Sequence, residues 1–138
     1  MPLNRKLQQV VDELSAVVDP QERLALLVDR AKRLPELAVE GRTAANRVSG
    51  CVSVVWLAGE MREGKCWFTC AAESPMVRAL VAFVAEFFSG FTPSEILASA
   101  VDPLESLGVA RNLSPTRRNG LDAARQAIRA FAQAHRDA

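Results

Sequence analysis

The stretch VSVVWLAGEMREGKCWFT, residues 52–69, decides the fold of this chain. Val52 to Leu57 is rich in β-branched and aromatic residues, and so is Lys65 to Thr69, as is typical of strands. The segment GEMREG between them carries charges and two glycines, as a hairpin connection does. The stretch therefore predicts two antiparallel strands, and Asn46 to Val48 is a candidate for a third, short strand.

Proline placement predicts where helices begin on either side of this hairpin. Five of the seven prolines directly follow a residue that commonly caps a helix N-terminus. The capping side chain accepts free backbone N–H groups, and proline fits the next position because its missing N–H is not needed there. We expect helix starts at Asp19-Pro20, Ser74-Pro75, Thr92-Pro93, Asp102-Pro103 and Ser114-Pro115. Three of them add a glutamate in the capping-box position: Glu22, Glu95 and Glu105.

Apolar residues outside the hairpin recur at helical spacing. The spacing predicts long helices over 3–18, 24–34, 76–88 and 121–131, and short helices over 92–98 and 103–107. The fold class is therefore α+β: two N-terminal helices, a small antiparallel β-sheet, then C-terminal helices packed on one sheet face. No repeat or linker interrupts the chain, so we expect a single domain over residues 1–138.

Composition narrows the classes of function. The net charge of +1 gives no strong field to attract nucleic acid. The longest apolar region is interrupted by Arg78 and Glu86, so we expect no membrane span. Three cysteines and no apolar signal-peptide core indicate free thiols in a reducing compartment. We expect a cytoplasmic protein, or one of an organelle matrix if a transit peptide has been removed.

Cys51 is the principal candidate for chemistry. Gly50 allows a tight turn before it, and the strand that follows fixes the thiol at the end of a rigid element. Such a position can present sulfur on an otherwise apolar surface. A free cysteine also often fills a small apolar gap in a core. Both interpretations stay open on these residues alone.

The remaining candidates favour structural roles. Cys66 and Cys70 share a strand face, lack the spacing of a redox pair and are expected to be small buried residues. His135, the only histidine, lies in a polar C-terminal tail, so a Cys–His catalytic pair is not expected. With no clustered ligands, we expect no bound metal.

Three arginines gather around the start of the last helix. The simpler interpretation is a solvated basic corner, and the functional one is a docking patch for an acidic partner surface. They are Arg111, Arg117 and Arg118.

Four fragments in order resemble the SufE-type sulfur-acceptor family of iron–sulfur cluster assembly. They are LPEL at 34–37, NRVSGCVSVVWL at 46–57, TPSEIL at 92–97 and LSPTRRNGL at 113–121. Their order and spacing match from about Asp19 to Ala134. The resemblance implies the compact α+β fold that SufE proteins share with iron–sulfur scaffold proteins.

The resemblance also implies a function. The protein would take persulfide sulfur from a pyridoxal-phosphate-dependent cysteine desulfurase, stimulate that enzyme, and pass the sulfur to an iron–sulfur scaffold complex. It would be an accessory carrier rather than a stand-alone enzyme, with no cofactor of its own. The implied partners are those two proteins, bound transiently by a monomer or weak dimer, with no nucleic acid and no membrane. Two alternatives stay open: an adaptor that activates a desulfurase without carrying sulfur, and a thiol-dependent enzyme with Cys51 as nucleophile.

The family's functional residues carry over by motif. The acceptor cysteine of GC-x-S-x-VW falls on Cys51, and its neighbours in the motif are Gly50, Ser53, Val55 and Trp56. The family's arginine in LTPSR-x-x-GL falls on Arg117. This chain departs from the family at three positions. Family members often have glutamine at the position of Val52 or Val54, next to the motif, and often have glycine at the position of Ala79.

Overall fold

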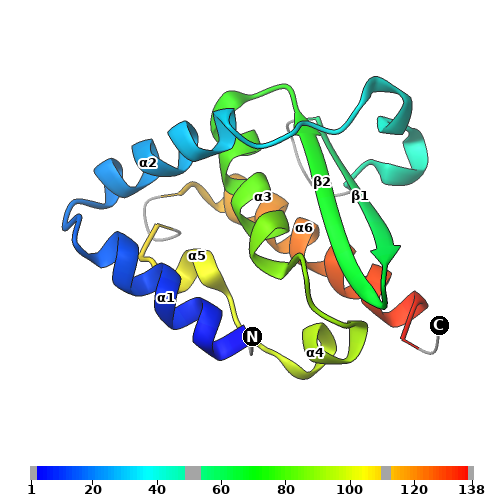
Figure 1. The fold of residues 1–138 in the computed structure, drawn as a ribbon. Coiled ribbons are helices and arrows are strands. Elements are labelled where there is room, and N and C mark those ends of the chain that lie inside the picture. Colours follow the sequence, from blue (N-terminus) through cyan, green and yellow to red (C-terminus); the bar gives the residue numbers. More distant parts are fainter. Residues whose placement is uncertain (1–2, 49–53, 110–112, 137–138) are drawn as a thin grey trace.

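The structure is a computed structural model, and it describes residues 3–48, 54–109 and 113–136 (Figure 1). Within these ranges, two helices come first, followed by two short 3₁₀ turns, a β-hairpin and four further helices, which confirms the α+β class. The elements are α1 (Leu3–Ser15), α2 (Pro20–Lys32), η1 (Val39–Gly41), η2 (Ala44–Asn46), β1 (Val55–Arg62), β2 (Lys65–Ala72), α3 (Pro75–Phe88), α4 (Pro93–Ala98), α5 (Pro103–Ser106) and α6 (Pro115–Ala134).

All five predicted proline helix starts are confirmed. In each, the side chain before the proline accepts a backbone N–H of the first helical turn. The reciprocal capping box forms at Thr92 and Glu95. At Asp19 and Asp102 the carboxylate caps its helix without a return bond from the glutamate, within the part of the chain that is described. The first helix was predicted to extend to residue 18. In the structure α1 ends at Ser15, and Val18 is 84% exposed.

The hairpin is longer than the sequence predicted. Strand β1 runs through most of the expected connection to Arg62, which pairs with Lys65. Only Glu63 and Gly64 form the turn, both at positive φ (52° and 77°), the conformation whose twist matches that of flanking strands. The third strand is reduced to an isolated bridge between Arg47 and Trp56.

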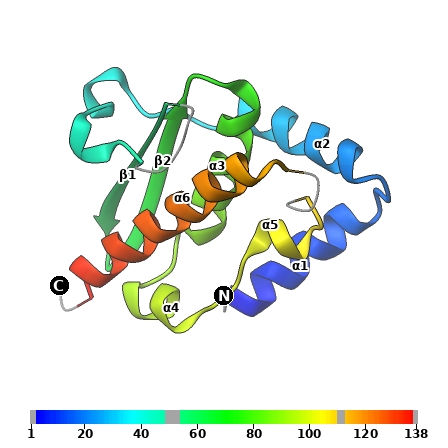
Figure 2. The ribbon, with the colours of Figure 1, turned by 180° about the vertical axis from the view of Figure 1, so that it is seen from behind.

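Helix α3 forms the centre of the core. Nine of its residues are buried, and it packs against both α2 and β2. Helix α6 crosses the same face of the hairpin (Figure 2), where the Phe131 ring meets Phe68 edge-on at 5.4 Å between centroids. Helices thus cover one face of the sheet, as predicted.

Lys6 links α1 to the C-terminal end of α3 by hydrogen bonds. Its ammonium donates to the carbonyl oxygens of Glu86 (3.0 Å) and Phe87 (2.7 Å), which lie in the last turn of α3. A cation at this helix end complements the helix dipole. Burial lowers the pKa of Lys6, with Glu86 opposing that shift.

Candidate functional site

The segment that carries Gly50, Cys51 and Ser53 lies in residues 49–53, outside the described part of the chain. Both residues that flank this segment are fixed at one end of the hairpin. The Val48 N–H donates to the Val55 carbonyl at 2.9 Å, and the Glu73 N–H donates to the Val54 carbonyl at 3.2 Å. We call this end, opposite the Glu63–Gly64 turn, the open end of the hairpin.

Trp56 lies at the open end, as the second residue of β1. It pairs with Ala71 of β2 on one side and with Arg47 on the other. Because side chains alternate along a strand, Trp56 faces away from the core that receives Val55 and Leu57. Its ring is half-buried. Trp56 therefore belongs to the outer face of the hairpin, beside the flanks of the cysteine segment.

Arg117 also lies toward this end of the molecule. It is exposed in the first turn of α6, where its backbone N–H donates to the Ser114 hydroxyl at 3.3 Å. Its Nη1 lies 2.9 Å from the sulfur of Met76, in the first turn of α3. Figure 2 shows the start of α6 beside the start of α3, which follows β2 after a short loop. Trp56 and Arg117 thus approach the open end from different elements.

A hollow beside Arg117 was missed by the sequence analysis. It has a volume of about 750 Å³ and lies between α2 and the starts of α3 and α6. Its lining combines apolar side chains, among them Leu24, Val28 and Met76, with the charged side chains of Asp29, Lys32 and Arg117. The sequence signal was the apolar periodicity over 24–34, which we used only to predict a helix, and in the structure Leu24 and Val28 are partly buried.

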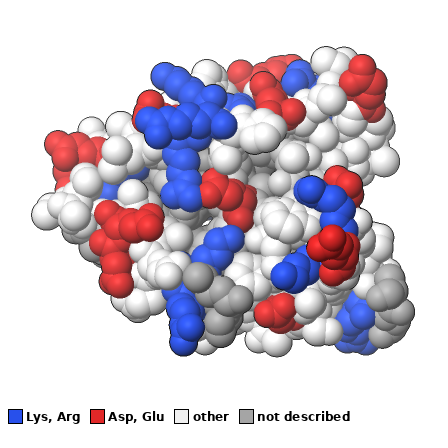
Figure 3. Space-filling view, viewed as in Figure 1, with Lys and Arg blue, Asp and Glu red and all other residues white. Residues whose placement is uncertain are grey.

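Basic side chains gather over the C-terminal end of α2, as Figure 3 shows. Two of them are paired: Arg33 contacts Asp29 at 2.8 Å, and Arg30 forms an ion pair with Glu86. The third, Lys32, borders the hollow beside Arg117. The charge available to an acidic partner on this side therefore centres on Lys32 and Arg117.

The other two thiols face the core. Cys66 is fully buried and Cys70 is 4% exposed, which confirms the structural interpretation of both. Burial raises the pKa of the Cys66 thiol and raises that of Cys70 to about 11, although Arg78 nearby opposes the shift. Because the thiolate is the nucleophile, both thiols are weakly reactive near neutral pH.

His135 lies far along the hairpin from the open end. It stacks on Phe131, with 4.1 Å between ring centroids, and Phe131 in turn covers Gly59 near the middle of β1. The ring nitrogen Nδ1 is 2.8 Å from the Phe131 carbonyl. The structure thus places the only histidine of the chain at the end of α6, held by its own helix.

The described ranges contain no group of three or more histidine, cysteine or carboxylate side chains that could hold a metal ion. The absence of a metal remains a prediction, because Cys51 lies outside those ranges.

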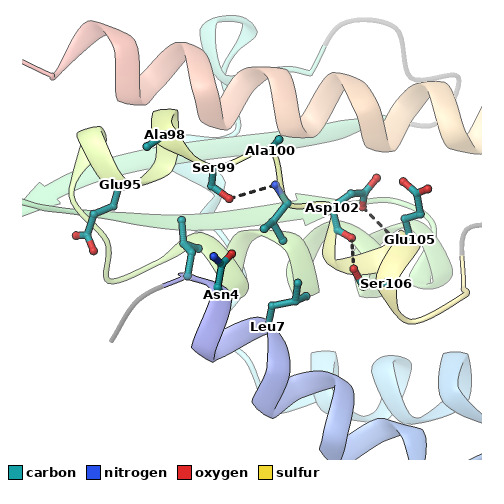
Figure 4. A pocket seen from close by; sticks show the side chains of 11 residues that line it. Asn4, Leu7, Glu95, Ala98, Ser99, Ala100, Asp102, Glu105 and Ser106 are labelled. Carbon is teal, nitrogen blue, oxygen red and sulfur yellow. Dashed lines mark hydrogen bonds between the residues drawn. The ribbon is translucent and has the colours of Figure 1, made fainter.

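A larger cavity, of about 880 Å³, lies between the start of α1 and the α4–α5 connection (Figure 4). Several of its polar groups are already engaged. Asp102 caps α5 and pairs with Arg125 at 3.3 Å, and the Ser99 hydroxyl accepts the Val101 N–H at 3.1 Å. These contacts give the wall of the cavity a structural role, and none of the predicted site residues lines it.

The fold and the family comparisons agree. The fold defines a small α+β domain with helices on one face of a hairpin. The family model "SufE: Fe-S metabolism associated domain" matches residues 8–132. The chain belongs to the SufE family, which its description associates with iron–sulfur metabolism.

Named relatives support this assignment. An uncharacterized SufE-like protein of Synechocystis is 33% identical over 114 residues, which cover 83% of this chain and 72% of that protein. One from Rhizobium etli is 38% identical over 120 residues, covering 83% and 81%. The chloroplastic quinolinate synthase of Nicotiana tabacum is 31% identical over 111 residues, covering 79% of this chain and 15% of that enzyme.

Solved structures confirm the fold. The solution structure of a hypothetical protein from Thermus thermophilus has a TM-score of 0.79 at 20% identity, covering 96% of this chain and 97% of that one. The crystal structure of another hypothetical protein has a TM-score of 0.51 at 18% identity, covering 79% and 95%. Within the described ranges, none of the helices combines the length and apolarity needed to cross a membrane.

Proposed function

We propose that this chain is a sulfur acceptor that carries persulfide sulfur on Cys51. It takes the sulfur from a pyridoxal-phosphate-dependent cysteine desulfurase, stimulates that enzyme, and passes the sulfur to an iron–sulfur scaffold complex in the cytoplasm. The observation that carries the proposal is the family membership over residues 8–132, combined with the match of the family's acceptor motif to Gly50, Cys51 and Ser53.

The transfer is an exchange at sulfur. The Cys51 thiolate attacks the outer sulfur of the desulfurase persulfide. A new S–S bond forms on Cys51, the desulfurase S–S bond breaks, and the desulfurase cysteine leaves as a thiolate that takes up a proton. No external oxidant or reductant is needed, because the outer sulfur keeps its oxidation state. The same exchange, run toward a thiol of the scaffold complex, delivers the sulfur.

The fixed flanks of the cysteine segment suit this transfer. Hydrogen bonds from Val48 and Glu73 anchor both sides of the segment to the hairpin. Trp56 borders the same end of the sheet, where its ring adds apolar surface beside the described flanks of the segment.

Arg117 has a positioning role in this proposal. Its guanidinium is exposed and offers several donors in a plane. With Lys32 across the hollow, it would orient an acidic surface of the desulfurase. We expect the encounter to be transient and the carrier to act as a monomer or weak dimer.

The test is the intact mass of the protein after incubation with a cysteine desulfurase and cysteine. We expect a gain of one sulfur atom, mapped to Cys51 by peptide mass spectrometry. Stimulation of the desulfurase without that gain would favour the adaptor. Turnover by this chain without any partner would favour the thiol-dependent enzyme.

A further inference from the structure

The Arg117 guanidinium lies against a methionine sulfur. Its Nη1 donates to the sulfur of Met76 at 2.9 Å, which joins the first turn of α6 to the first turn of α3. Figure 2 shows these two helix starts beside each other. A thioether sulfur is only a weak hydrogen-bond acceptor. While Met76 is unmodified, the Arg117 guanidinium is therefore weakly held and can turn to another acceptor.

Met76 is also within reach of a small oxidant. Its side chain is only partly buried and lines the hollow between α2, α3 and α6, and its contact with Arg117 is exposed to solvent. Asp29 lines the same hollow, but its carboxylate is paired with Arg33 at 2.8 Å. The hollow thus places an accessible sulfur next to an exposed cation.

The geometry points to Met76 as an oxidation site that controls Arg117. A peroxide is the oxidant. The sulfur lone pair attacks one peroxide oxygen, an S–O bond forms, and the O–O bond breaks. The departing hydroxide takes the proton of the transferred oxygen and leaves as water, so the sulfur is oxidised to the sulfoxide and the peroxide is reduced. The inference rests on the proposed function, because Arg117 acts there as a docking group.

Oxidation changes the acceptor that Arg117 meets. A sulfoxide oxygen carries partial negative charge, and a hydrogen bond from a charged donor to oxygen is stronger than a neutral one. The oxygen forms on the sulfur to which Nη1 already donates, so it holds the guanidinium against α3. An acidic desulfurase surface then competes with the sulfoxide for the same donors. Oxidation of Met76 therefore weakens docking, and a methionine sulfoxide reductase restores it.

Met61 offers a matched comparison within the same chain. It is also partly buried, but its sulfur lies 3.7 Å from the Sγ of the fully buried Cys66, near the turn end of the hairpin. A sulfoxide at Met61 leaves the contact between Met76 and Arg117 unchanged. Any loss of docking that follows oxidation of Met61 would be a general effect of a polar group in the fold.

The experiment uses the full chain with Cys51→Ser, so that peroxide cannot act on the acceptor thiol. The protein is treated with hydrogen peroxide and freed of it, and peptide mass spectrometry locates the sulfoxide. Calorimetry then measures the affinity for a cysteine desulfurase. We expect a sulfoxide on Met76 and about fivefold weaker binding, comparable to the effect of removing the Arg117 side chain. Treatment with methionine sulfoxide reductases should restore the affinity.

Four variants in the same background separate this mechanism from general damage. Met76→Leu should bind equally well before and after peroxide, whereas Met61→Leu should still lose about fivefold in affinity. In Arg117→Ala, peroxide should cause no further loss, because the group that the sulfoxide holds is gone. Met76→Gln places a permanent carbonyl acceptor beside Arg117 and should bind as weakly as the oxidised chain without any peroxide.

A second measurement does not need the desulfurase. Hydrogen exchange of the Arg117 guanidinium, followed by NMR, should slow on oxidation of Met76 as the side chain gains a stronger acceptor. Failure of the untreated chain to bind a desulfurase would contradict the proposed function and leave this signal to decide the oxidation site. The inference is overturned by the absence of a Met76 sulfoxide, by unchanged guanidinium exchange, or by an equal loss of affinity in the Arg117→Ala background.

Discussion

The two ends of the β-hairpin differ in the backbone contacts that hold them. The turn end is closed by Glu63 and Gly64, and nearby the Cys66 backbone is hydrogen-bonded to Phe91. The open end is held by single backbone bonds from Val48 and Glu73. The turn end is closed by its own backbone contacts, whereas the open end joins the sheet to the cysteine segment of the family motif.

The difference extends to the thiols. Cys66 lies near the turn end and Cys70 farther along the same face, both buried and both with raised pKa. A thiol built into a packed sheet stays protonated and inaccessible, and therefore stable. Sulfur transfer needs the opposite properties. The burial of Cys66 and Cys70 therefore makes both of them poor candidates for a sulfur-carrying thiol.

The largest effect expected from this comparison is on sulfur transfer. Cys51→Ser is nearly isosteric, so the fold and desulfurase binding should remain. Both the mass gain of one sulfur atom and the stimulation of the desulfurase should be abolished. Intact-protein mass spectrometry and a sulfide-release assay measure the two.

Serine at the buried positions provides the controls. Cys66→Ser and Cys70→Ser should lower stability, by about 1–3 kcal/mol if the hydroxyl is left without a partner. Their folded fractions should still accept sulfur on Cys51. Sulfur appearing first on Cys66 or Cys70, with Cys51→Ser still active, would contradict the carrier proposal.

A second prediction concerns alkaline pH. The pKa of Cys70 is raised to about 11 in the fold from an ordinary value of 9.0, so the folded state keeps a proton that the unfolded state loses. This contribution to stability is complete below pH 9 and is lost as pH rises toward 11, amounting to roughly 3 kcal/mol. Urea denaturation between pH 8 and pH 11 measures it.

Cys70→Ala is the control for that titration. Lys6, whose pKa is lowered by burial, acts in the opposite direction over the alkaline range, and Cys66, whose pKa is raised, acts in the same direction. The wild-type curve alone therefore mixes these contributions. The difference between wild type and Cys70→Ala isolates the thiol. A difference that stays constant from pH 8 to pH 11 would show that Cys70 ionises in the fold as easily as in the unfolded chain.

A third prediction concerns the packing of β1 by α6. A Cβ added at Gly59 would lie 2.5 Å from the Phe131 ring, which is itself held between Phe68 and His135. Gly59→Ala should therefore destabilise the fold by about 1–3 kcal/mol. In a Phe131→Ala background the same change should cost much less, and thermal unfolding of the four variants gives the coupling. Equal costs in both backgrounds would mean that Phe131 moves aside freely.

Much of the fold was predictable because its signals are local. An N-cap followed by proline needs only its own turn, so all five predicted helix starts are confirmed. The hairpin connection was predicted too long, since charges and glycines within 59–64 resemble a loop. In the structure, Gly59 is a strand residue whose missing side chain admits Phe131, a long-range contact that no local pattern reveals.

The candidate site was only partly predictable. The burial of Cys66 and Cys70 followed from strand alternation and is confirmed. The positions of Gly50, Cys51 and Ser53 lie outside the described residues, so their roles stay predictions. The hollow beside Arg117 arises from three elements far apart in sequence, and apolar periodicity cannot distinguish a stripe that is covered from one left partly open.

The smallest expected effect belongs to Arg117, at the edge of the open end. Arg117→Ala removes an exposed side chain whose described contact is with the Met76 sulfur, so the free energy of unfolding should change by less than about 0.5 kcal/mol. If the guanidinium orients an acidic desulfurase surface, stimulation should fall about fivefold, equivalent to roughly 1 kcal/mol. Arg117→Lys should restore part of it, because lysine keeps the charge but lacks the planar donors.

Lys65→Ala removes an exposed charge at the turn end and should leave stimulation unchanged. Equal losses in Arg117→Ala and Lys65→Ala would assign the effect to net charge rather than to the open end, and stimulation unchanged by Arg117→Ala would return this residue to a solvated basic corner.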